Sequence, residues 1–382
     1  MLATTALATR HAHSAAQFAD PNAGQYGAVS PRPLNFPRDH GAHPEYRTEW
    51  WYLTGWLDRP GKAPPLGFQV TFFRARTSID SSNPSAFAAK QLMIAHAAIA
   101  DPARGSLLHD QRLARTGFGA ASFSTDDTAL LLDRWQLMRS PSGSYRSVIP
   151  ARGFTLELEA SPTQPLLLQG DAGYSRKGQT ARHASYYYSQ PQLSVRARLA
   201  HSAKTAAAEE LTGQAWLDHE WSSTLLSDQA AGWDWIGMNL DDGSALTAFS
   251  IRPVSSPTLP LGPPPARLPA PLPAPLAAPL HAYASLRPRG AGVQTFGPDD
   301  VRFSTLAEWS SPRTQAIWPI AREIRIGRRI FTTQPLLNDQ ELDSRLTTGA
   351  VYWEGASRLL EDGRQVGRGY LEMTGYVAPL RL

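Results

Sequence analysis

Residues 66–73 read Leu-Gly-Phe-Gln-Val-Thr-Phe-Phe, and apolar side chains occupy every second position from Leu66 to Phe72. This period of two is typical of a β-strand with one face buried. The same alternation occurs at residues 154–159 and 193–199, and turn signals such as Asp241-Asp242-Gly243 separate such runs. Because short strands and turns follow one another along the chain, the sequence predicts a mainly β protein whose antiparallel strands form a sandwich or barrel.

Departures from this pattern are few. Helical periodicity is scarce, and we predict short helices only near residues 202–210 and 339–345. Between Pro253 and Leu280 the chain has 11 prolines in 28 residues. Proline lacks the N–H group that a paired strand needs, so we interpret residues 253–280 as an extended insertion within a domain.

Composition narrows the function classes. The chain has 382 residues, 42% of them hydrophobic, which is enough for two domains with separate cores. It contains no cysteine, so disulfides, thiolate metal sites and cysteine nucleophiles are excluded. The net charge is +4, but the basic residues are scattered with no run longer than two, and we expect no nucleic-acid partner. No apolar run approaches the roughly 18 residues of a membrane-spanning helix.

Residues 1–33 are predicted to form a targeting or disordered segment. Residues 1–16 are small and apolar, and residues 12–16 resemble the region that precedes a signal-peptide cleavage site. The apolar core at residues 2–8 is short for a signal peptide, and no basic residue precedes it. We therefore favour a periplasmic or secreted location over a cytoplasmic one.

A first cluster of polar and aromatic residues spans residues 40–52. It contains two histidines, two glutamates and four other aromatic residues, among them Trp50 and Trp51. A metal site would need a third ligand from elsewhere, and Pro44 prevents the helix on which an HxxH pair would bind a metal. We predict no metal here. The two tryptophans either plug a barrel end or line a ligand site.

A second cluster, Trp216-Leu217-Asp218-His219-Glu220-Trp221, carries the strongest chemical signal. On a strand, Asp218 and Glu220 point to one side, while His219 and Trp221 point to the other. Two carboxylates beside an apolar interior raise each other's proton affinity, and a carboxyl group that stays protonated near neutral pH serves as a general acid. The alternative is a strand end whose carboxylates are ion-paired.

Two further clusters carry carboxylates on aromatic strands. They are Trp233-Asp234-Trp235, and Tyr352-Trp353-Glu354 followed by residues 369–376. For most of these residues the alternative is ordinary barrel packing, with each glutamate paired to arginine. His96 lies in an apolar run and is either a core histidine or a ligand contact. Nucleophile-elbow, H-E-x-x-H, Walker A and dinucleotide motifs are absent.

The order of these blocks resembles that of one family, the carotenoid 1,2-hydratase/AttH family of bacterial secreted proteins. The resemblance covers residues 34–382 except the proline-rich insertion. It implies two lipocalin-like antiparallel β-barrel domains in tandem, at residues 34–226 and 227–382. The blocks that carry it are residues 36–41, 49–52, 93–96, 173–178, 184–189, 218–222, 233–235, 352–355 and 369–376.

The resemblance also implies a hydrophobic ligand, such as an isoprenoid, a polyene or another lipid, and a reaction without a cofactor. In the hydratases an acid protonates a terminal C=C bond, a tertiary carbocation forms, and water captures it. On this basis the catalytic candidates are Asp218, His219 and Glu220. The ligand-binding candidates are Trp50, Trp51, His96, Tyr188, Trp221, Asp234, Trp235, Trp353 and Glu354.

One departure from the hydratase pattern bears on the acid. After the turn at residues 241–243, a hydratase is expected to carry an acidic residue on the next strand, but residues 246–249 have none. The acid would then come from Asp218, Glu220 or Asp234. The alternative function is a non-catalytic periplasmic lipid carrier, peripherally associated with a membrane and with an ABC exporter as its partner.

Overall fold

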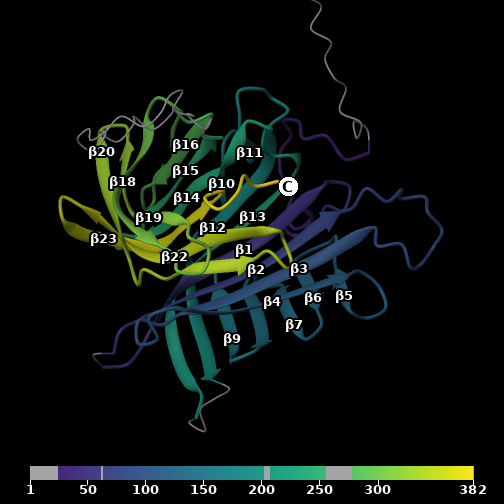
Figure 1. Cartoon of the computed structure of the whole chain (residues 1–382), viewed down its shortest axis with the longest axis horizontal. Coiled ribbons are helices and arrows are strands. Elements are labelled where there is room, and N and C mark those ends of the chain that lie inside the picture. Colours follow the sequence, from purple (N-terminus) through teal and green to yellow (C-terminus); the bar gives the residue numbers. More distant parts are fainter. Residues whose placement is uncertain (1–24, 62, 202–206, 255–277, 382) are drawn as a thin grey trace, which may run out of the picture.

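The computed structural model describes residues 25–61, 63–201, 207–254 and 278–381 (Figure 1). Their regular structure consists of β-strands, apart from one 3-10 turn, η1, at Arg38–His40. In the described residues no helix is long and apolar enough to cross a bilayer. The prediction of a mainly β protein is confirmed.

The first sheet is antiparallel and has the strand order β4-β3-β2-β1-β13-β12-β9-β8-β7-β6-β5, with β10 and β11 paired to β12. It curls into a nearly closed barrel (Figure 1). Its strands are β1 (Thr48–Asp58), β2 (Leu66–Arg76), β3 (Gln91–Ala100), β4 (Leu107–Arg115), β5 (Ala121–Phe123), β6 (Ala129–Leu132), β7 (Trp135–Arg139), β8 (Tyr145–Ala151), β9 (Phe154–Ser161), β10 (Leu167–Leu168), β11 (Tyr174–Arg176), β12 (Ala184–His201) and β13 (Glu209–Thr224).

The second sheet is also antiparallel and forms a half-barrel, with the order β17-β16-β15-β14-β23-β22-β20-β19-β18 and β21 paired to β22. The expected tandem of lipocalin-like barrels is therefore confirmed. Its strands are β14 (Ala230–Leu240), β15 (Ala245–Pro253), β16 (His281–Arg287), β17 (Gln294–Phe296), β18 (Val301–Ser310), β19 (Ile317–Ile326), β20 (Arg329–Pro335), β21 (Glu341–Ser344), β22 (Ala350–Glu361) and β23 (Arg364–Thr374).

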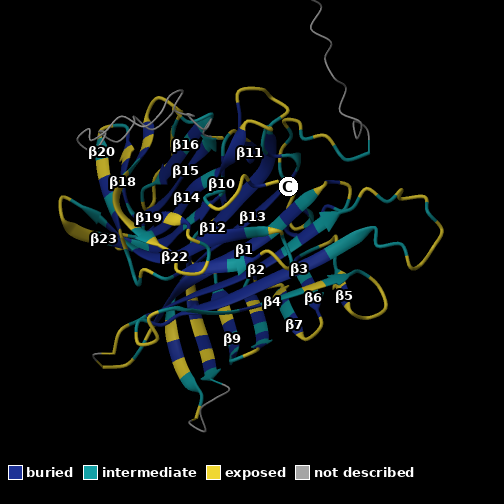
Figure 2. Ribbon diagram, in the orientation of Figure 1, coloured by how far each residue is buried: buried dark blue, intermediate teal, exposed yellow. Residues whose placement is uncertain are grey.

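Strand β1 shows how alternation supplies two hydrophobic cores. Trp51 and Leu53 point into the core of the first barrel. Tyr52 and Trp56, on the opposite face, pack with side chains of the second sheet in a separate cluster between the two sheets. Both faces of β1 are consequently buried, and Figure 2 shows this strand almost wholly in the colour of buried residues. The second sheet has a further core of its own.

The described residues contain neither of the two predicted helices as a helix. Residues 339–345 contain strand β21 instead of a helix, because Glu341–Ser344 pair with β22 in an antiparallel register. That prediction is wrong. Of residues 202–210, the part at 202–206 lies outside the described residues, and Glu209 and Glu210 already belong to β13. Most of the predicted N-terminal segment and of the proline-rich insertion, namely residues 1–24 and 255–277, also lie outside them.

Candidate functional site

A small cavity lies between the two sheets, where aromatic rings and carboxyl groups meet. Its volume is about 40 Å³, which is room for a few water molecules. Asp218 and Glu220 face it from β13, as their alternation on a strand predicted. The lining residues are Trp50, Tyr52, Lys177, Tyr187, Asp218, Glu220, Leu225, Trp233, Trp235, Phe249, Ile251 and Glu372. We call this space the intersheet pocket.

Asp218 is fixed by three donors. Its Oδ1 accepts hydrogen bonds from Ser189 Oγ and Trp216 Nε1, both at 2.6 Å, and its Oδ2 accepts one from the Tyr187 hydroxyl at 2.7 Å. Burial raises the pKa of Asp218 to about 7 and the nearby Glu220 adds to the effect, although the three donors oppose it. This carboxyl group can therefore gain or lose a proton near neutral pH.

Glu354 and Glu372 form a second acidic element. They are direct partners across the β22–β23 pair, so their side chains share one face of the sheet. Burial raises the pKa of Glu354 to about 7. Burial, together with the neighbouring Glu354, raises the pKa of Glu372 well above its ordinary value. At neutral pH this pair therefore holds a proton, and Glu372 is the member that lines the pocket.

Lys177 is the one cation among the residues that line the pocket. Its Nζ lies 3.0 Å from Glu220 Oε1 and donates to Ser175 Oγ at 3.0 Å. The ammonium group sits over the rings of Tyr187 and Phe249, 4.6 and 4.1 Å from their centroids. Burial lowers the pKa of Lys177, while Glu220 opposes that shift. The Lys177–Glu220 ion pair thus balances charge at one side of the pocket.

Tryptophan rings complete the wall. Trp50 from β1 and Trp233 from β14 are half-buried and nearly parallel, with centroids 6.4 Å apart and an interplanar angle of 13°. Trp235 donates from Nε1 to the Tyr187 hydroxyl at 3.0 Å, and its ring contacts Tyr52 edge-on. The pocket therefore presents π-faces, which stabilise cations, beside carboxyl groups that carry protons.

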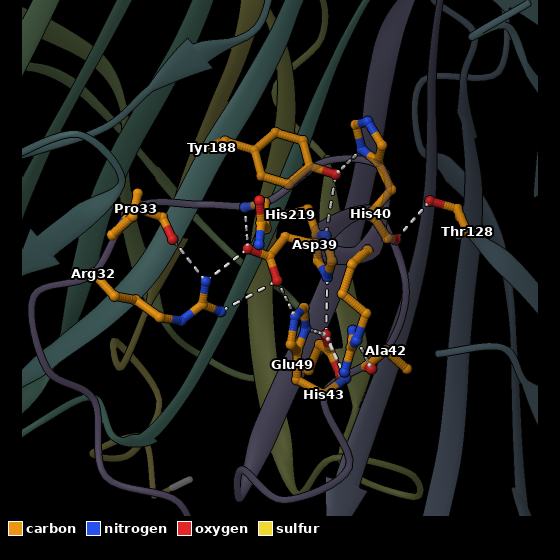
Figure 3. A network of polar contacts seen from close by, with 12 residues as sticks. Arg32, Pro33, Asp39, His40, Ala42, His43, Glu49, Thr128, Tyr188 and His219 are labelled. Atoms are coloured by element: carbon orange, nitrogen blue, oxygen red, sulfur yellow. Dashed lines mark hydrogen bonds and ion pairs between the residues drawn. The ribbon is translucent and has the colours of Figure 1, made fainter. Parts of the chain in front are cut away.

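A different polar network fills the end of the first barrel (Figure 3). Each ring nitrogen of His43 meets a carboxylate: Nδ1 lies 2.7 Å from Glu49 Oε1, and Nε2 lies 3.0 Å from Asp39 Oδ1. Only an imidazolium donates from both nitrogens. Burial opposes that charge, but Glu49 and Asp39 raise the pKa of His43 above its ordinary value. Trp221 stacks on this ring at a centroid distance of 3.8 Å.

His219 joins the same network from β13. Its Nε2 lies 2.9 Å from Glu49 Oε1, and its Nδ1 lies 3.1 Å from the Tyr188 hydroxyl. Burial lowers the pKa of His219 to about 4, so the ring is neutral and donates to Glu49. Glu49 also accepts from Arg74 Nε at 2.7 Å. This carboxylate thus has two histidines and an arginine as donors.

The donor atoms of His43, Glu49 and His219 lie within 4.8 Å of one another, a spacing that would allow a metal ion. The surrounding bonds do not favour one. The second oxygen of Glu49, Oε2, already accepts hydrogen bonds from Arg74 Nε and from the backbone N–H of His43. The second ring nitrogen of His43, Nε2, bonds to Asp39. A divalent cation would replace protons that these bonds need and would lie beside a guanidinium group. We interpret the cluster as a hydrogen-bonded ion network.

The structure brings together only part of the predicted site. Asp218, Glu220, Trp50 and Trp235 line the intersheet pocket, and Glu354 lies behind it, where it accepts a hydrogen bond from Tyr52. The sequence patterns do not identify four of the residues that line the pocket: Glu372, Lys177, Tyr187 and Trp233. Glu372 lies in a block for which arginine-paired barrel packing is the alternative, and only the strand register that sets it opposite Glu354 identifies it.

The other candidates lie outside the intersheet pocket, and their contact with a ligand stays a prediction. His219, Trp221, Trp51 and Tyr188 lie on strand faces that turn toward the first barrel. His219 therefore does not share the pocket with Asp218 and Glu220. The two neighbouring tryptophans, which were expected to share one role, point in opposite directions. Trp50 faces the pocket, and Trp51 faces the core of the first barrel.

Three more candidates have structural partners outside the pocket. Asp234 is paired with Arg252 and Arg322 at 3.1 Å each, so its carboxylate belongs to the interior of the second sheet. Trp353 is part of that sheet's core. His96 is buried and lies 3.0 Å from the Thr347 hydroxyl, in agreement with the interpretation as a core histidine.

Comparison with known proteins places the chain. The model of the AttH-like family matches residues 27–259 and 276–376. The chain belongs to the AttH-like family. A search of curated proteins gives no significant match for this AttH-like protein. Among solved structures it is similar to a candidate AttH from Nitrosomonas europaea, with 46% identity and a TM-score of 0.79, over 91% of this chain and 99% of that one.

A second solved structure that this AttH-like protein resembles is kievitone hydratase from Nectria haematococca. The TM-score is 0.62 and the two share 11% identity, over 93% of this chain and 98% of that one. At this identity the likeness concerns the fold alone. It extends across both sheets, so the two-sheet arrangement that forms the intersheet pocket recurs at low sequence identity.

Proposed function

We propose that the intersheet pocket binds a hydrophobic unsaturated molecule of the isoprenoid or polyene class and adds water across its terminal C=C bond. The observation that carries this proposal is the Glu354–Glu372 pair, which holds a proton beside tryptophan rings in a buried pocket. Alkene hydration needs an acid that is protonated at neutral pH and surroundings that stabilise a carbocation. The hydratase with a similar fold adds support for this reaction class.

The roles follow from the environments of the carboxyl groups. Glu372 transfers its proton to the less substituted alkene carbon, which leaves a tertiary carbocation next to Trp50, Trp233 and Trp235. Water attacks the cation, and Asp218 takes the proton that the water loses. The product is a tertiary alcohol, and the proton gained by Asp218 replaces, through solvent, the one lost by Glu372. No electron is gained or lost overall.

The substrate is larger than the pocket of about 40 Å³. Trp50 and Trp233 are half-buried, so they are the rings that can move aside as a ligand enters. A planar group between two rings needs a separation of about 7 Å, close to the 6.4 Å between these centroids. A terminal isoprene unit can then lie between the two indole rings with the rest of the molecule outside.

Hydration is tested with geraniol and lycopene in ¹⁸O-labelled water, with mass spectrometry of the extracted alcohol. The wild-type protein should give a product that carries ¹⁸O. Glu372→Gln and Asp218→Asn should each reduce the rate by about two orders of magnitude or more. Glu157→Gln changes a partly exposed carboxylate on β9; it is the matched control and should retain the full rate. A Glu372→Gln variant as active as the wild type would contradict the assignment of the acid.

A second candidate, a non-catalytic carrier, is favoured by the many rings around the pocket. In this function the protein carries a lipid in the periplasm and delivers it to an ABC exporter. The same incubations separate the two candidates. Saturable quenching of tryptophan fluorescence by lycopene without any labelled alcohol would support the carrier, and labelled alcohol would support the hydratase.

A further inference from the structure

Two phenylalanine rings project from the end of the first barrel. Phe87 is 74% exposed and Phe118 is 64% exposed, although both are large and apolar. Their rings stack on one another with centroids 5.4 Å apart. They lie on two loops that we call together the aromatic tip, residues 77–90 after β2 and residues 116–120 after β4; these loops are exposed (Figure 2).

The tip is held in place by Arg115. Its guanidinium carbon lies 4.3 Å from the centroid of Phe118 and 5.6 Å from that of Phe87, and its Nη1 donates to the Ala86 carbonyl. Lys90 Nζ ties the first loop to itself through the Ser81 carbonyl at 2.8 Å. The two rings are therefore packed against the Arg115 guanidinium group, and both side chains remain largely exposed to solvent.

The tip and the residues that adjoin it carry a small excess of positive charge. Lys90 and Asp80 lie within residues 77–90, and Arg76 and Arg115 immediately precede the two loops. Exposed aromatic rings above a layer of arginine and lysine match the boundary between acyl chains and anionic headgroups, where rings enter the apolar layer and cations reach phosphate.

The tip also lies at the same end of the first sheet as the intersheet pocket. Trp50 of the pocket pairs with Phe73, three residues before β2 ends and the first loop begins. Arg115, the last residue of β4, pairs with Leu92 near the start of β3. A surface that touches the tip would therefore lie beside the end of the sheet where Trp50 stands.

We propose that the aromatic tip docks on an anionic lipid bilayer. Phe87 and Phe118 enter the boundary of the acyl chains, and Arg115 and Lys90 contact the headgroup phosphates. This surface is independent of the proposed reaction, because neither ring lines the pocket. It gives the protein a membrane-bound orientation in which the pocket end faces the bilayer that would dissolve a hydrophobic ligand.

The test is co-sedimentation of the full chain with vesicles of phosphatidylcholine alone and of equal parts phosphatidylcholine and phosphatidylglycerol. The wild type should bind the anionic vesicles, and added salt should weaken binding. Phe87→Ser with Phe118→Ser should lower the partition coefficient by about tenfold for each ring. Leu346→Ser is the matched control, because Leu346 is 90% exposed on a different loop, and it should bind like the wild type. Thermal unfolding of each variant verifies that it is folded.

Several outcomes would overturn the proposal. One is a wild-type protein that stays in the supernatant with both kinds of vesicle. Another is an equal loss of binding in the Leu346→Ser variant. A third is a dimer in sedimentation velocity that the Phe87→Ser, Phe118→Ser variant abolishes while vesicles bind neither protein, since the tip would then contact a second copy of the chain.

Discussion

The Tyr52 hydroxyl, on β1 of the first sheet, donates a 2.5 Å hydrogen bond to the Glu354 carboxyl group, on β22 of the second. The bond links residues 302 positions apart and crosses the boundary between the two sheets. It also gives the Glu354–Glu372 pair a donor from the first sheet, which therefore helps to hold the acid of the second. This hydrogen bond therefore both joins the two sheets and positions the proposed acid pair.

Replacing Tyr52 with phenylalanine should destabilise the protein by about 1–3 kcal/mol, because a buried carboxyl oxygen loses its donor. Urea unfolding measures the change. Tyr352→Phe is the control: its hydroxyl is also buried, but its hydrogen bond to Thr348 is long, at 3.4 Å. Equal losses of unfolding free energy in the two variants would contradict a specific stabilising contribution of the Tyr52–Glu354 hydrogen bond.

Glu354 should make the protein less stable as the pH rises. Its pKa is about 7 in the folded protein against an ordinary 4.5, so between these values the native state holds a proton that the unfolded chain has released. Its contribution is fully present below pH 4.5 and declines up to about pH 7, by a total on the order of 3 kcal/mol. Unfolding at pH 5 and pH 8 should show a smaller pH dependence in Glu354→Gln than in the wild type.

Glu49→Gln should be strongly destabilising, by about 3–5 kcal/mol, because Arg74 and His43 keep their buried charges and lose the carboxylate between them. Glu157→Gln removes a partly exposed carboxylate 3.6 Å from Arg198 and should cost less than about 1 kcal/mol. Urea unfolding of both variants tests the difference, and similar midpoints would contradict the importance of the Glu49 network.

The protonation of His43 and His219 is directly measurable. Nitrogen-15 NMR of histidine-labelled protein at pH 7 should show both His43 ring nitrogens protonated and His219 neutral, since a carboxylate faces each ring nitrogen of His43 and the pKa of His219 is about 4. His43→Gln and His219→Gln variants assign the signals. A neutral His43 ring would remove one of the two donors assigned to that side chain.

Removing metal ions should leave the protein unchanged. Because His43, His219 and Arg74 all donate to Glu49, treatment with a chelator should not shift the melting temperature. Added zinc should likewise give no saturable stabilisation. If zinc raised the melting temperature of the wild type but not of His219→Gln, the network would be a metal site, contrary to this prediction.

The alternation of single strands was predictable from the sequence, and so was part of the site. Leu66, Phe68, Val70 and Phe72 all lie in the first barrel core. What period two cannot reveal is what covers the opposite face. Gln69 and Thr71 are buried as well, since the second sheet and its loops cover that side. Asp218 and Glu220 share a face as expected, yet their pocket partners come from distant parts of the chain.

Residues 339–345 illustrate the limit of local propensity. The segment Asp339 to Arg345 contains good helix formers. Glu341–Ser344 nevertheless form a strand, because they pair with β22, and no local sequence pattern predicts that pairing. Glu372 illustrates the same limit for chemistry. Only the register that sets it opposite Glu354 turns two ordinary glutamates into a proton-holding pair.

The pocket wall is divided between two halves of the polypeptide: Trp50, Asp218 and Glu220 precede Thr224, the end of β13, while Trp233 and Glu372 follow Ala230, the start of β14. Severing the backbone at residues 225–229 would leave each fragment with an incomplete enclosure. Ligand capture would then depend on reassociation of the fragments, and the protein would act as its own complementation reporter.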